Sequence, residues 1–128
     1  MKLNVMFTIA AIYGFVIGLG ALLAPGTMAE AGGLQASSGV LMSTRFLGVA
    51  NIGLALIAWL VRNADASKAR DAVTLAFTVF FALHALTSLY GQFTDTSTSL
   101  HWVMATLQGL IAAGFFMAGK ASMSAPAK

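Results

Sequence analysis

The sequence predicts an all-α integral membrane protein, in which four antiparallel helices form one bundle. Hydrophobic residues make up 59% of the 128 residues and charged residues 9%, against roughly 45–50% and about 25% in ordinary soluble domains. The mean hydropathy is +0.85. The apolar residues also gather in four segments. Each is about 20 residues long, the length of helix that crosses about 30 Å of hydrocarbon. A membrane domain therefore fits better than a soluble enzyme or a disordered chain.

The four apolar segments account for the helices in order. They span residues 3–24, 40–61, 72–91 and 100–118. The first ends before Pro25, since a proline disfavours helix at the preceding residue. It superficially resembles a signal peptide, but its apolar run is longer than the roughly 7–15 residues of a signal sequence, so we expect a retained helix. We expect one domain over residues 1–120 and a flexible tail over residues 121–128.

The connectors between these segments are too short for a second domain. Residues 25–39 are small and weakly polar, and Thr27 and Glu30 have the spacing of a capping box. That spacing favours a one-turn helix lying at the membrane interface. Residues 92–99 are rich in hydroxyl groups, and Ser99 is a natural N-cap for the last helix.

Basic residues predict the orientation in the membrane. Four crossings put six of the seven basic residues on one side, namely Lys2, Arg62, Lys68, Arg70, Lys120 and Lys128. The loops of the other side carry only Glu30 and Asp95. Because cytoplasmic loops are enriched in Lys and Arg, we expect both termini in the cytoplasm.

Small residues at helical spacing predict where helices approach closely. In lipid, apolar contact does not drive helices together, so small side chains mark the interfaces. The predicted packing residues are Gly14, Gly18, Gly48, Asn51 and Gly109, with Asn51 as a polar contact between helices. These residues either close the bundle of a single chain or form a face, on the first helix, that mediates oligomerisation.

Polar residues at membrane depth are the candidates for a site, because ionisable groups are costly there. Arg45 lies about 8 Å below the outer end of the second helix, and His84 lies at a similar depth in the third. The tentative ligand-binding set is Arg45, His84, His101, Trp102, Gln108 and Phe81. Each also has a structural explanation: Arg45 can extend to the interface and pair with Glu30 or Asp95, and the histidines can bond a neighbouring helix.

The same residues restrict the available chemistry. The chain has no cysteine, which excludes disulfides and thiolate metal sites, and we assign no metal ligands and no catalytic residues. Haem held by two histidines is disfavoured, since His84 and His101 differ by roughly 9 Å in depth. No cofactor is required. The seven basic residues form no stripe for nucleic acid.

One resemblance to a known group covers about the first ninety residues. The chain reads LLAPG, then TRFLGVANIGLALIAWLVR, then a short basic loop and further helices, with Arg45, Gly48 and Trp59 as distinctive positions. This pattern resembles small bacterial four-helix membrane proteins of the DoxX-like group, whose function is unknown. The resemblance implies a bundle in the cytoplasmic membrane that serves as an accessory to a redox or transport system, and it carries over no catalytic residue.

Three functions stay open from the sequence. The first is a non-enzymatic accessory or interaction subunit, which lies in the lipid bilayer and contacts a second copy or another membrane protein. The alternative is a binding protein for a small lipophilic molecule such as a quinone, with the binding site in the outer half of the bundle. Arg45 and His84 would then donate hydrogen bonds to the carbonyl groups of the quinone, and aromatic residues would line an apolar pocket around it. The third is a small channel or transporter, which the absence of an acidic residue from the predicted spans disfavours.

Overall fold

The computed structural model describes residues 2–94 and 98–123, and all regular secondary structure in them is helical. The helices are α1 (Leu3–Leu23), α2 (Pro25–Ala31), α3 (Ser38–Val61), α4 (Lys68–Thr94) and α5 (Leu100–Met123). Within the described residues, α1, α3, α4 and α5 are long and apolar enough to cross a membrane. The chain is therefore a multi-pass membrane protein with the four helices expected, and α2 is a short fifth helix between the first two.

The short helix α2 differs from the expected capping box. It begins at Pro25, whose fixed φ suits the first helical position, and Thr27 lies inside the helix rather than at its cap. The N-cap residue is Ala24, which makes no side-chain hydrogen bond. Gly33, with φ 78°, ends the helix in the left-handed turn that glycine adopts most easily, and the Leu34 N–H donates to the Ala29 carbonyl at 2.9 Å.

Two long helices extend past their apolar segments. Helix α4 includes charged residues from Lys68 onward and runs to Thr94, whereas the apolar run spans 72–91. Helix α5 continues to Met123, so the expected tail is helical over residues 121–123, and its remainder lies outside the described residues. Hydropathy marks the part of a helix that lies in hydrocarbon, but the hydrogen-bonded backbone can continue into the interface.

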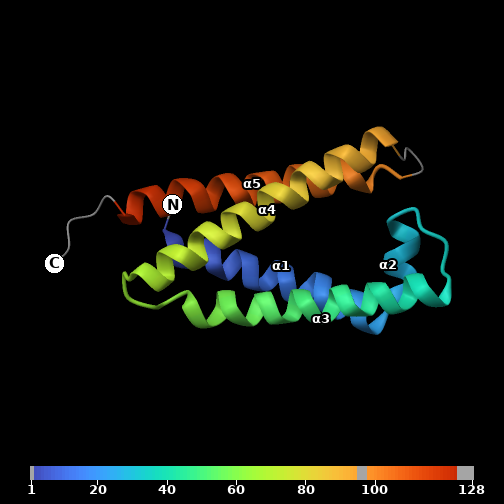
Figure 1. Cartoon of the computed structure of the whole chain (residues 1–128), viewed down its shortest axis with the longest axis horizontal. Helices are drawn as coiled ribbons and strands as arrows, with labels where there is room; N and C mark the ends of the chain where they lie inside the picture. Colours follow the sequence, from blue (N-terminus) through green and yellow to red (C-terminus); the bar gives the residue numbers. More distant parts are fainter. Residues whose placement is uncertain (1, 95–97, 124–128) are drawn as a thin grey trace.

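The long helices lie in two pairs, α1 along α3 and α4 along α5 (Figure 1). The pairs meet through α1 and α5. In Figure 1 they lie closer together at the end that carries the N-terminus and diverge toward the end that carries α2. At the wider end the Thr98 hydroxyl donates to the Ala31 carbonyl at 3.1 Å, which connects α2 to the start of α5.

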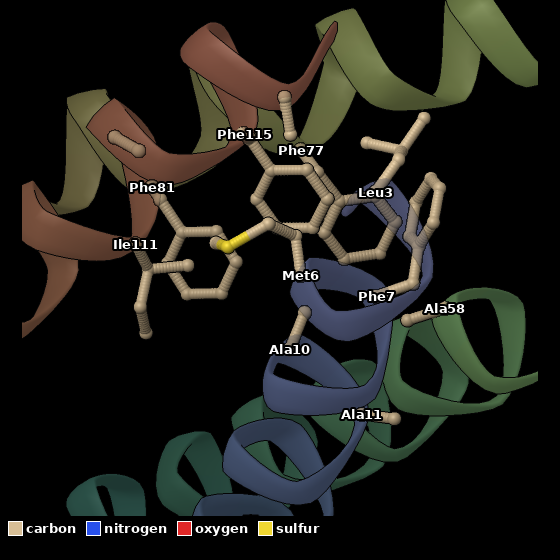
Figure 2. Close-up of a cluster of buried hydrophobic side chains, with 12 residues drawn as sticks. Leu3, Met6, Phe7, Ala10, Ala11, Ala58, Phe77, Phe81, Ile111 and Phe115 are labelled. Carbon is tan, nitrogen blue, oxygen red and sulfur yellow. The ribbon is translucent and has the colours of Figure 1, made fainter. Parts of the chain in front are cut away.

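The hydrophobic core joins the two pairs in the half nearer the N-terminus (Figure 2). Its centre is aromatic: the Phe7 ring of α1 lies 5.8 Å from Phe77 and 5.2 Å from Phe115, between centroids. Phe115 also packs 6.2 Å from Phe81. Aromatic rings at these spacings attract one another beyond the effect of their buried area. The largest fully buried side chains of the described residues, Phe7, Phe81, Phe115 and Met6, all lie in this part of the molecule.

Candidate functional site

The predicted glycine motif of α1 packs against α3 within the same chain. A Cβ added at Gly14 would lie 2.9 Å from the Ala55 Cβ, and one added at Gly18 would lie 2.9 Å from the Gly48 carbonyl oxygen. The two backbones therefore touch, as glycines permit in membrane helices. This face of α1 is covered by α3, so it is not available to a second copy of the chain.

Two other predicted packing residues behave differently. Asn51 is buried, but its amide donates to the Leu47 carbonyl at 2.9 Å, one turn earlier in its own helix. The described hydrogen bond of its side chain therefore stays within α3, and it is the Asn51 backbone carbonyl that lies against Gly14 of α1. A Cβ at Gly109 would meet Ala85 at an ordinary 3.9 Å. Gly109 faces α4 without the tight approach seen between α1 and α3.

Gln108 is the centre of a polar cluster that joins three helices. Its side chain, 5% exposed, lies 2.7 Å from the Tyr13 hydroxyl of α1 and 3.1 Å from the Ser88 hydroxyl of α4. When the amide oxygen accepts from Tyr13, the amide nitrogen lies within 3.1–3.2 Å of three acceptors, the Ser88 hydroxyl and the backbone carbonyls of His84 and Met104, and its two N–H groups can donate to two of them. All of its hydrogen-bonding groups are then satisfied, as buried polar groups require.

His84 borders this cluster without bonding to it through its ring. The imidazole Nδ1 lies 3.0 Å from the Phe80 carbonyl of its own helix, and the two rings are 4.1 Å apart between centroids. His101 lies farther out, against Gly91, where an added Cβ would meet the imidazole at 3.3 Å. Each histidine thus packs on α4, and no described interaction joins the two rings.

Arg45 projects away from the rest of the chain. Its side chain is exposed on α3 and makes no hydrogen bond or ion pair with any residue that the structure describes. Glu30, one of its expected partners, is exposed on α2, and the other, Asp95, lies outside the described residues. Helix α3 packs along α1 rather than along α4, which carries His84.

The remaining predicted residues face in opposite directions. Phe81 is 1% exposed and belongs to the aromatic core. Trp102 is exposed, packs edge-on against Phe93 with centroids 6.0 Å apart, and lines two open depressions, one between α4 and α5 and one on the surface of α5. The tentative ligand set is therefore spread over the core, the polar cluster and the outer surface.

Among the main depressions of the described part of the chain, this set contributes only Trp102. Four depressions stand out there, and Arg45, His84 and His101 line none of them. No three histidine or acidic side chains among the described residues come together in a way that could hold a metal ion. The binding of a quinone thus stays a prediction without a supporting cavity.

The predicted ligand set omits two members of the polar cluster, Tyr13 and Ser88, although Ser88 is part of the polar stripe that His84 begins on this helix. Tyr13 carries the only aromatic hydroxyl in α1, and Ser88 lies one helical turn after His84. Neither of these features of the sequence predicts that the two side chains contact Gln108, because Tyr13 and Gln108 are far apart in sequence.

Comparison of the chain with protein-family models, with curated proteins and with solved structures finds no match.

Proposed function

We propose that this protein is a non-enzymatic subunit of a larger membrane assembly, an antiparallel four-helix bundle in which α3 binds a membrane helix of another protein. The observation that carries the proposal is Arg45. It is a charged side chain at membrane depth, exposed, and without a partner among the described residues. An arginine at the bilayer centre costs about 2.5–3.5 kcal/mol to insert, and one nearer the interface costs less, yet charged residues within membrane spans are rare and usually serve a function.

The exposed side of α3 also has the side chains that a partner helix requires. At 100° per residue, Gly39, Ser43, Ala50 and Gly53 fall within an arc of about 80°, and all four are exposed. A Cβ added at Gly39 or at Gly53 would meet nothing within 4 Å. Small residues of this kind let helix backbones approach in lipid. On the same count Arg45 lies about 80° outside this arc, between it and the side that faces α1, and would pair with an acid or a carbonyl of the partner.

The orientation part of the proposal rests on the basic residues. Lys2, Arg62, Lys68, Arg70 and Lys120 lie at or near the ends of α1, α3, α4 and α5 that share one side of the molecule. By the positive-inside rule this side faces the cytoplasm. With the resemblance to DoxX-like proteins, this supports a location in a bacterial cytoplasmic membrane.

Cysteine cross-linking in native membranes tests the proposal, because the chain contains no cysteine of its own. We expect Gly53→Cys on the exposed side of α3, alkylated with a thiol-specific photoactivatable cross-linker and irradiated, to form an adduct with a second protein. Leu83→Cys, which is also exposed but lies on α4, is the matched control and should form no adduct. Arg45→Gln should lower the yield of the adduct several-fold, since it removes the charge that selects the partner.

The possible results separate the alternatives. An adduct of twice the mass of the chain would identify a second copy as the partner. Equal labelling from Gly53→Cys and Leu83→Cys would show collision in the bilayer rather than docking. If neither variant cross-links and Arg45→Gln purifies like the parent as a monomer, Arg45 only extends to the interface and the proposal is wrong.

A further inference from the structure

A basic depression lies at the end of the molecule opposite α2, away from the exposed side of α3. It has a volume of about 490 Å³. The ends of all four long helices surround it, and its polar lining comprises Lys2, Asn4, Arg62, Asn63, Arg70 and Ser122. Because the ends of membrane-spanning helices lie at the depth of the lipid headgroups, this depression opens where phosphate groups are concentrated.

The charge of the depression is not balanced by acids of the chain. No aspartate or glutamate is among its lining residues. Asp71 follows Arg70 directly, but it lines a different depression between α4 and α5, together with Lys120. Asp65 is exposed in the connector between α3 and α4. Three cationic side chains therefore face one space without a described counter-ion.

The two arginines are held in place by their own helices. The Arg62 guanidinium lies over the Trp59 ring, 3.5 Å from its centroid, and donates to the Trp59 carbonyl. A guanidinium has five N–H donors, so most of those of Arg62 stay available. The Ser67 hydroxyl accepts from the Arg70 backbone N–H at 3.2 Å and fixes the first turn of α4.

Arg70 is a half-buried cation of the depression, and its guanidinium makes no hydrogen bond or ion pair with any residue that the structure describes. Its Nε is covered from solvent, so the terminal nitrogens of the guanidinium are the donors that a ligand in the depression would meet. Arginine matches the geometry of phosphate oxygens with two parallel N–H bonds. The volume leaves room for a phosphate group with several waters, since one water occupies roughly 30 Å³ of liquid.

We propose that this depression binds a phosphate group at the membrane surface, with Arg70 and Arg62 as the principal donors and Lys2 as a further positive charge. The phosphate belongs either to the headgroup of an anionic lipid or to a small phosphate in solution. The recognition is the same in both cases: charge-assisted hydrogen bonds from two arginines in a basic recess.

Trp59 provides a direct readout, because it stacks under Arg62 at the site. Trp102→Phe leaves Trp59 as the only tryptophan, since the chain has two. We would titrate the full-length Trp102→Phe protein in a neutral detergent with a short-chain phosphatidic acid, with inorganic phosphate, and with a short-chain phosphatidylcholine. We expect the emission of Trp59 to change saturably with phosphatidic acid and not with phosphatidylcholine.

Substitutions separate a built site from general charge attraction. Arg70→Gln should weaken binding about tenfold, the loss expected for a hydrogen bond to a charged group. Lys68→Gln removes the same charge two residues away, from a residue that does not line the depression, and should weaken binding less than Arg70→Gln, by about fivefold at most. Arg70→Lys keeps the charge and should recover part of the affinity. Helical circular dichroism and gel filtration verify that each variant is folded.

Each outcome decides the question. Saturable binding of phosphatidic acid alone assigns the site to a lipid headgroup, and comparable binding of inorganic phosphate assigns it to phosphate in general. If the folded protein binds neither, or if Lys68→Gln and Arg70→Gln weaken binding equally, the depression is only part of a diffuse positive surface and the proposal fails.

Discussion

Gly48→Ala tests how closely α1 approaches α3. An added Cβ at Gly48 would lie 2.8 Å from the Gly18 carbonyl oxygen and 2.9 Å from the Leu22 nitrogen, both backbone atoms. Backbone atoms cannot rotate away as a side chain does, so the two helices have to separate. Overpacking of this kind costs about 1–3 kcal/mol.

The matched control is Gly53→Ala on the same helix, where an added Cβ meets nothing within 4 Å. Both substitutions gain the same helix propensity, up to about 1 kcal/mol, so the gain cancels in the comparison. We therefore expect Gly48→Ala to be less stable than Gly53→Ala by about 1–3 kcal/mol, the cost of overpacking. At about 2 kcal/mol the unfolding equilibrium differs roughly thirtyfold.

Reversible unfolding in mixed detergent micelles, followed by circular dichroism, measures this difference. The free energy of unfolding of each variant is extrapolated to the same detergent composition as the parent. If Gly48→Ala and Gly53→Ala agree within about 0.5 kcal/mol, smaller than any overpacking cost, the backbones of α1 and α3 are not in contact at Gly48, and the reasoning is refuted.

Two further predictions concern the core and the polar cluster. Phe115 is 0% exposed, so Phe115→Ala should lower the free energy of unfolding by about 3 kcal/mol, as expected for a large cavity. The neighbouring Phe116 is 56% exposed, and Phe116→Ala should change the free energy of unfolding little. Equal effects of the two substitutions in the same detergent assay would contradict the packing of α5. The Tyr13 hydroxyl lies 2.7 Å from the Gln108 amide, so Tyr13→Phe and Gln108→Leu should each destabilise the protein. In a double-mutant cycle the two substitutions should show a coupling energy of about 0.6–1.7 kcal/mol, as for other membrane hydrogen bonds. Additive effects of the two substitutions would show that this hydrogen bond contributes nothing to stability.

The helices themselves could be predicted from the sequence because lipid leaves the backbone no alternative. Within hydrocarbon every N–H and C=O must be paired inside the segment, so each long apolar run becomes a helix, and the runs ending near Leu23 and Val61 match α1 and α3 closely. Helix ends in the interface follow no such requirement. For this reason the start of α4 at Lys68 and the extension of α5 past residue 118 did not follow from hydropathy.

The choice of contact faces was decided by the tertiary structure. Helix α3 has small residues on two sides, Gly48 and Ala55 on one, Gly39 and Gly53 on the other, and only the first pair is covered by α1. In water an apolar stripe would identify the buried side, but in lipid both sides of a helix are apolar, and the pattern loses that information.

The polar contacts required the fold for a related reason. Gln108 was recognisable as a polar group at membrane depth, yet its partner Tyr13 lies on a helix at the other end of the chain. The basic depression likewise draws Lys2, Arg62 and Arg70 from three separate helix ends. The sequence alone determined that the chain has four segments long and apolar enough to cross a membrane, and which polar residues lie within them. Only the packing of helices distant in sequence decided which of them meet, because those contacts depend on side-chain shape rather than on hydropathy.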